Sequence, residues 1–293
     1  MQRMDEFVYT TEVRTDDRLR ESFNALTRAS FGFDFAAWYQ VGGWTDAYCP
    51  HALVLDGQVV SNVSVNRMAF VRNGQTRRYL QLGTVMTDTA YRGQGLNRRL
   101  MEHILADYKD TVDGIYLFAN DSVLAYYPKF GFKPLTETAY VMDTDPHGAA
   151  PYHIQPVAAD DPGLAAAMAE SPESDSNDGF RMVQNPGLFH FWLLAEYGDC
   201  VYRVPEIGGY VIARAENGIL QIVQSFAEKP IDYTRLAAAF DGAGSVALGY
   251  TPADPSGFGA APYREEDTTL FVLGEPLQAI ERERLRFPAL SHA

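Results

Sequence analysis

The chain has 293 residues, enough for two domains with a core each, and its 46% apolar and 21% charged residues are typical of globular proteins. The 24 Lys and Arg against 38 Asp and Glu give a net charge of −14. This balance argues against nucleic acid as the main partner, because phosphate backbones are bound by clustered basic side chains, and mildly favours a cationic substrate such as an amine.

The sequence also lacks the usual signs of export, membrane insertion and metal binding. Its two cysteines, Cys49 and Cys200, lie far apart and belong to no Cys-x-x-Cys pair or His cluster. The first residues contain no apolar signal segment, and no run of about 18 apolar residues occurs in the sequence. We therefore expect a cytoplasmic protein with no metal and no membrane partner.

The first 40 residues predict one short strand and two helices. β-branched and aromatic residues predict a strand over 7–13. Thr15 is predicted to cap a helix that runs to Arg28, because acidic residues follow it and leucine and phenylalanine recur at helical spacing. A shorter helix is expected over 33–39.

Residues 52–87 then predict three strands joined by tight turns. Asp56-Gly57 separates two apolar runs, which is a strong hairpin signal, and Asn73-Gly74 marks a second turn. The third strand, over 77–87, is expected to be central in a sheet.

A basic, glycine-containing turn follows the end of this central strand. The strand ends at Val85, Met86 and Thr87, and an amphipathic helix begins after the run Arg92-Gly93-Gln94-Gly95-Leu96-Asn97. A helix N-terminus leaves about four backbone N–H groups unpaired and carries partial positive charge, so a glycine-rich entry lets an anion approach closely. The stretch predicts a phosphate cradle, with an ordinary strand-to-helix turn as the alternative.

The rest of the first half predicts a crossover unit and a closing strand. A buried strand is expected over 115–119, followed by a short helix that Asn120 and its neighbours cap. A last strand is expected over 138–142. The Pro- and Gly-containing segment 143–151 is the predicted boundary between domains 1–145 and 146–293.

The second half repeats this order of elements without repeating the residues. Residues 171–179 are polar and predict a loop. Beyond them, helices are expected near His190–Trp192 and around Leu236, and strands are expected over 201–204, 209–214, 219–226, 245–250 and 268–273. Because no basic glycine-rich turn follows Phe226, we expect this half to lack a phosphate cradle and to form a wall of the substrate site or a subunit interface.

Residues 5–143 resemble the GNAT superfamily of acyl-CoA-dependent N-acetyltransferases in three features. The run Arg92 to Asn97 fits the family signature except at Asn97, where the family has a small residue. Asn120 stands where the family has an asparagine after the next strand, and Tyr127-Pro128-Lys129-Phe130-Gly131-Phe132 looks like its Tyr-x-x-x-Gly-Phe element.

This resemblance implies the fold, the co-substrate and its binding residues. It implies a mixed-sheet α/β GNAT fold, followed by a degenerate GNAT-like domain as in enhanced-intracellular-survival type acetyltransferases, whose third domain has no room here. It also implies acetyl-CoA as co-substrate. The implied contacts are Val85, Met86, Thr87, Arg92, Gly93, Gln94, Gly95, Leu96, Asn97, Arg98 and Asn120.

By the same resemblance, Tyr127 is the expected acid that protonates the leaving thiolate, with Tyr126 as its competitor. The backbone N–H of Met86 is the expected oxyanion donor. The strand before the signature contains no acid, so no general base is assigned. Asp88, Glu137 and Asp143 are the nearest acids in sequence, and each is more often an ordinary surface charge.

The function expected from these observations is transfer of acetyl from acetyl-CoA to a primary amine of a small molecule, such as an amino sugar or a polyamine, by direct attack. Two alternatives stay open at this point: an acetyltransferase for peptide or protein amines, and a non-catalytic acyl-CoA-binding regulatory module. Neither the acceptor nor the oligomeric state follows from the sequence, so a homo-oligomer is also open.

Overall fold

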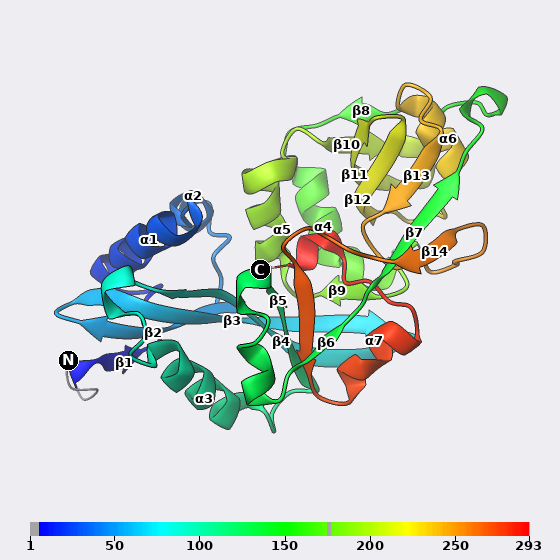
Figure 1. Ribbon diagram of the computed structural model, residues 1–293. Coiled ribbons are helices and arrows are strands. Elements are labelled where there is room, and N and C mark those ends of the chain that lie inside the picture. Colours follow the sequence, from blue (N-terminus) through cyan, green and yellow to red (C-terminus); the bar gives the residue numbers. More distant parts are fainter. Residues whose placement is uncertain (1–5, 175–176, 293) are drawn as a thin grey trace.

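The structure is a computed structural model that describes residues 6–174 and 177–292, without the side chains of residues 146 and 170–174. Within these residues the strands form two sheets, one of eight strands and one of seven. Figure 1 shows the second sheet beside the first, at the upper right, with the first sheet flanked by α1 and α2 on one face and α3 on the other.

The first sheet has the spatial order β1-β2-β3-β4-β5-β15-β6, and β9 pairs with the far end of β3. All its neighbours are antiparallel except β4 and β5. Its strands are β1 (Val8–Thr10), β2 (Tyr48–Leu55), β3 (Gln58–Arg72), β4 (Gln75–Thr87), β5 (Gly114–Ala119), β6 (Lys133–Leu135), β9 (Arg181–Val183) and β15 (Thr269–Leu273).

The second sheet has the order β14-β7-β13-β12-β11-β10-β8. Its parallel pair is β12 and β13, and the other neighbours are antiparallel. Its strands are β7 (Thr138–Asp143), β8 (Gln155–Pro156), β10 (Val201–Val204), β11 (Gly209–Glu216), β12 (Ile219–Phe226), β13 (Ser245–Leu248) and β14 (Gly259–Pro262).

The two sheets exchange one strand with each other. β15, from the end of the chain, lies between β5 and β6 in the first sheet, and β7 lies between β13 and β14 in the second. With these two strands interchanged, both sheets have the same order, so the repeat expected from the sequence is present in the topology. The expected division at residue 145 is not a division between sheets, since β7 leaves the first half and β15 returns to it (Figure 1).

Helices cover both faces of the first sheet, and others pack on the second (Figure 1). α1 contacts β3 and β4, α3 contacts β2, β3 and β4, and α6 packs on β13. The helices are α1 (Asp17–Phe31), α2 (Ala36–Gln40), α3 (Leu96–Tyr108), α4 (Pro162–Ser174), α5 (Pro186–Trp192), α6 (Tyr233–Ala239) and α7 (Ala279–Arg282), with a π-helical turn over Leu193–Tyr197.

Three local predictions were wrong. Asp16, and not Thr15, caps α1: its carboxylate accepts the N–H groups of Arg18 and Leu19, at 2.9 and 3.0 Å, while the Thr15 hydroxyl donates to Glu12. The short helix expected after Asn120 consists of two 3₁₀ turns. α4 includes residues 171–174 of the expected loop, and residues 175–176 lie outside the described residues.

One apolar core joins the two halves. Phe287 is fully buried, and its ring stacks on Tyr116 of β5 with centroids 4.2 Å apart. The same ring contacts Phe70 of β3 and Phe180, at 5.2 and 5.3 Å. Because β3 and β5 belong to the first sheet and Phe287 lies near the end of the chain, the last residues help to hold the first sheet in place.

Candidate active site

A bulge in β4 opens the first sheet beside β5. Asn62 pairs with Met86 and Ser64 pairs with Gly83, so Thr84 and Val85 together stand opposite one residue of β3. Thr84 has the left-handed φ of 47°, which is uncommon for a β-branched residue. The β4–β5 pairing ends at Leu82 and Leu117, and beyond this point β4 and β5 have no paired residues.

The backbone alternation of β4 decides which N–H groups face this opening. The Asp88 N–H donates to Val60 O at 2.9 Å, on the β3 side. Alternate residues of a strand direct their N–H groups to the same side, so the Met86 N–H is directed to β3, and those of Val85 and Thr87 are directed to the opening. The geometry therefore disfavours the expected oxyanion role of the Met86 N–H.

The N-terminus of α3 lies at one end of the opening. Gly95, at the N-cap, and Gly93 both have left-handed φ values, 79° and 75°, and a Cβ added to either would meet no atom within 4 Å. This conformation suits glycine, and the free space in front of it leaves the first-turn N–H groups accessible. The geometry fits a pyrophosphate group.

Two polar side chains brace this turn, one against β4 and one against β3. Arg92 Nε donates to Thr87 O at 3.1 Å. The Asn97 Oδ1 accepts the Ser61 hydroxyl at 2.7 Å, and that hydroxyl also bonds to the Thr87 hydroxyl at 2.9 Å. The side chain that departs from the family signature is therefore hydrogen-bonded to the sheet.

Tyr127 and Tyr126 stand next to each other on the β5 side of the opening. Tyr127 is 4% exposed and packs on Phe271 of β15, and burial raises its pKa to about 12. The Tyr126 hydroxyl is buried without a hydrogen-bond partner in the described residues, and burial also raises its pKa. A phenol with a raised pKa stays protonated at neutral pH, so either hydroxyl can donate a proton.

Asn120 is fixed by a residue that the sequence did not single out. Its Nδ2 donates to the Asp267 carboxylate at 2.9 Å and to Asp267 O at 3.3 Å. The same carboxylate accepts the Asp121 N–H at 2.7 Å. The segment before β15 thus positions the end of β5, and the Oδ1 of Asn120 is the atom left for a ligand.

These elements enclose a cleft of about 700 Å³ between the splayed strands and α3. It brings together all the sequence-predicted site residues except Gln94, namely Val85, Met86, Thr87, Arg92, Gly93, Gly95, Leu96, Asn97, Arg98, Asn120 and Tyr127. Tyr126, the competitor of Tyr127 for the role of the acid, lines the cleft too.

Comparison with known proteins identifies the part of the chain that forms this cleft. Residues 14–135 match the family described as an acetyltransferase (GNAT) domain. This region is a GNAT domain. The domain makes the chain an acyltransferase, and the family uses acetyl-CoA as its co-substrate.

Solved structures share the GNAT fold over most of the chain. A probable N-acyltransferase of Enterococcus faecalis V583 is 19% identical with a TM-score of 0.56, covering 87% of this chain and 70% of its own. Eis1 of Mycobacterium abscessus is 17% identical with a TM-score of 0.54, covering 86% and 69%. A GCN5-related N-acetyltransferase of Kribbella flavida is 16% identical with a TM-score of 0.55, covering 91% and 71%. No curated protein sequence matched the chain.

The three acids near the GNAT signature in sequence do not line the cleft. Asp88 caps the turn before Arg92 by accepting the Ala90 N–H at 2.8 Å, and Asp143 lies in β7 of the second sheet. Glu137 is buried, and its Oε1 accepts the Phe287 N–H at 2.7 Å. These positions give none of them access to an amine in the cleft.

Glu137 should make the stability of the protein depend on pH. Burial raises its pKa to about 7 from an ordinary 4.5, against the opposing effects of the Phe287 N–H and Arg286. Between these values the folded state holds a proton that the unfolded state has lost, so this contribution to stability is lost as pH rises to about 7. Glu137→Gln should remove this dependence, so the thermal unfolding midpoint of the variant should rise relative to that of the wild type from pH 4.5 to 7. Parallel thermal unfolding curves across that range would contradict the assignment.

The described residues contain no group of three or more His, Cys, Asp or Glu side chains that could hold a metal ion. In the same part of the chain, no helix has the length and apolar character needed to cross a membrane.

Several residues that line the cleft gave no signal in the sequence, above all Phe31 at the end of α1, and Thr84 and Phe118 on the two splayed strands.

Proposed function

We propose that the chain transfers acetyl from acetyl-CoA to a primary amine of a small molecule, by direct attack of the amine on the thioester. The cleft carries the proposal, because one continuous space runs from the N-terminal end of α3 to Tyr126 and Tyr127. A phosphate-bearing thioester needs an anion-binding group at one end of such a space and a proton donor for its leaving thiolate at the other.

The residues fit acetyl-CoA in this orientation. The first-turn N–H groups between Gly93 and Arg98 would bind the pyrophosphate, with Arg98 as an exposed counter-charge. The backbone N–H groups of Val85 and Thr87, which face the opening, would hydrogen-bond to the pantetheine arm as they would to an added strand. The thioester then lies near the bulge, where the β4–β5 pairing has ended.

The reaction needs a neutral amine, an oxyanion donor and an acid. The amine nitrogen forms the C–N bond as the C–S bond breaks, and the pair of electrons of that bond leaves with sulfur. Backbone N–H groups at the bulge would stabilise the carbonyl oxygen, and Tyr127 would protonate the thiolate. Since no described acid near the signature lines the cleft, we propose that water accepts the proton of the amine.

We also propose that the chain contains two units, a catalytic GNAT domain over 1–145 and a GNAT-like domain over 146–293, with β7 and β15 exchanged. The second unit would form a wall of the acceptor site. In its own sheet the space after the last paired residues of β12 and β13 is taken by the end of the chain, since the Ala289 N–H donates to Gly249 O at 2.7 Å. This packing leaves no equivalent opening for a second acetyl-CoA.

Thiol release tests the function. The full chain should release CoA thiol from acetyl-CoA in the presence of small primary amines and should bind CoA in calorimetry. Binding without release across a broad amine panel would instead favour a regulatory module. Release only with peptides would favour a protein amine as acceptor. Absence of CoA binding would exclude all three functions: small-molecule acetylation, protein acetylation and a regulatory module.

Gly95→Ala should weaken CoA binding about 10-fold, because a left-handed alanine either shifts the N–H groups away or places its Cβ in front of them. Gly218→Ala is the matched control, since Gly218 has a φ of 77° and equally open surroundings outside the cleft. Calorimetric titration should show the loss for Gly95→Ala alone. Equal affinities of the two variants would show that the α3 entry does not bind the phosphates.

A further inference from the structure

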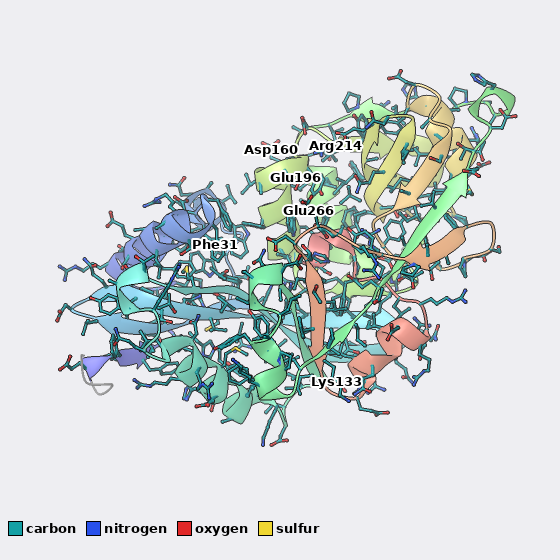
Figure 2. All side chains as sticks on the ribbon, viewed as in Figure 1. Phe31, Lys133, Asp160, Glu196, Arg214 and Glu266 are labelled. Atoms are coloured by element: carbon teal, nitrogen blue, oxygen red, sulfur yellow. The ribbon has the colours of Figure 1, made fainter. Side chains whose placement is uncertain are left out.

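A second cavity, of about 580 Å³, adjoins the acetyl-CoA cleft. The two spaces share three lining residues, Phe31, Thr84 and Phe118. Figure 2 shows Phe31 at the end of α1, on the side toward the helices of the second half. We call this space the aromatic cavity, because its walls include Phe33, Phe35, Trp38, Tyr48, Phe191 and Trp192.

Both halves of the chain build the aromatic cavity. Trp38 of α2 stands edge-on to Phe191 of α5 with ring centroids 5.5 Å apart, and Trp38 Nε1 donates to Gly187 O at 2.7 Å. Phe35 lies 5.6 Å from Phe191. The rings are therefore fixed by contacts between elements about 150 residues apart, and the space between them is a preformed site of the size that small ligands occupy.

Asp34 and His292, which both line the cavity, supply no free negative charge. The Asp34 carboxylate accepts the Ala36 N–H at 2.8 Å and pairs with Arg28, and these bonds lower its pKa. Burial and Arg286 lower the pKa of His292 to about 3, so this ring is neutral. A polyamine or amino sugar would lose water around several charged or hydroxyl groups here with few partners to replace it.

A pair of hydroxyl groups lies where the cavity meets the cleft. The Tyr48 hydroxyl hydrogen-bonds to the Thr84 hydroxyl at 2.5 Å, and Thr84 lines both spaces. Hydroxyl oxygens accept N–H groups, and the faces of neighbouring aromatic rings attract a cationic nitrogen. A nitrogen at this junction would stand beside the bulge where the thioester is placed.

From these observations we infer that the acceptor is a primary amine joined to an aromatic ring by a short chain, with the ring in the aromatic cavity and the nitrogen at the Tyr48–Thr84 pair. The inference rests on the proposed function and narrows its substrate class. The products are the N-acetylated arylalkylamine and CoA thiol. A competing occupant of the same space is the chain of a longer acyl-CoA, which the experiment distinguishes.

Steady-state turnover of the full chain with acetyl-CoA tests the inference. The kcat/KM for 2-phenylethylamine and tryptamine should exceed that for spermidine and glucosamine by at least about 10-fold, as expected when one ring is buried. Equal or better use of the polar amines would overturn the substrate class and leave the proposed function standing. Absence of thiol release with all four amines would instead count against the proposed function. Calorimetry of 2-phenylethylamine with CoA present would then decide the inference, because absence of binding overturns it.

A charge placed at the rim gives a second readout. Leu194, which lines the aromatic cavity, is 49% exposed, so Leu194→Asp should fold and lower kcat/KM for 2-phenylethylamine at least about 5-fold, with a smaller loss for spermidine. Ile219→Asp is the control, because Ile219 is 43% exposed in β12 and lines neither space. Identical effects of the two variants would overturn the inference.

Octanoyl-CoA separates the two occupants. With the ring in the aromatic cavity, octanoyl-CoA should be used more slowly than acetyl-CoA with 2-phenylethylamine, because the chain and the ring compete for one space. Faster use of octanoyl-CoA, lost in Leu194→Asp, would show that the cavity holds the acyl chain and would overturn the inference.

Discussion

Tyr127→Phe should lower kcat about 100-fold, the lower end of what a positioned proton donor contributes, while the affinity for CoA stays unchanged. The substitution removes only the hydroxyl. The ring that packs on Phe271 and Phe132 is kept, so the fold should be undisturbed. Stopped-flow or steady-state thiol release measures kcat, and calorimetry measures CoA binding separately.

Tyr126→Phe is the matched control for this prediction. Both rings line the cleft, their centroids are 5.3 Å apart, and each variant loses one phenolic hydroxyl. We expect less than about a 3-fold change in kcat for Tyr126→Phe, since hydrogen bonding by a group that is not the proton donor contributes little to the chemical step. The reverse ranking would move the role of acid to Tyr126.

Phe287→Ala should destabilise the protein by about 3–5 kcal/mol, the range for truncating a buried Phe. The ring is fully buried against Phe70, Tyr116 and Phe180, so its removal leaves a cavity where the two halves meet. The hydrogen bond from its backbone N–H to Glu137 would stay in place, so the loss of stability would come from packing alone. Urea unfolding monitored by circular dichroism gives the change in midpoint.

Phe33→Ala provides the comparison for stability. This side chain is 44% exposed, and we expect its loss to cost less than about 1 kcal/mol. Similar midpoints for Phe287→Ala and Phe33→Ala would show that the core between the halves contributes little to stability. A change confined to the second half in Phe287→Ala would show that the halves unfold separately.

Local signals in the sequence predicted the cofactor side of the site. Two glycines after a strand need the left-handed region, and a helix follows them, so a few adjacent residues determine the cradle at Gly93 and Gly95. Each Asn-Gly or Asp-Gly turn that was identified also has positive φ at both residues, as at Asp56-Gly57. These features depend on neighbours in sequence, which is why the sequence reveals them.

Features that depend on distant residues were not predictable in this way. β7 and β15 have ordinary strand composition, and nothing in either sequence says which sheet the strand joins. Each simply pairs with the edge of another strand, β7 with β13 and β15 with β5. Asp267 holds Asn120 across 147 residues, and the aromatic cavity needs α2 to meet α5. Such contacts follow from the assembled topology and from no local pattern.

The return of β15 has a consequence for the order in which the protein can be made. β5 is complete at residue 119, but the strand that covers its edge ends at residue 273. A chain growing from its N-terminus therefore carries an exposed strand edge beside the nascent cleft for more than half of its synthesis, and such edges favour aggregation. The GNAT domain can close only after the ribosome has made nearly the whole chain, so the active site and the second half mature in a single late event.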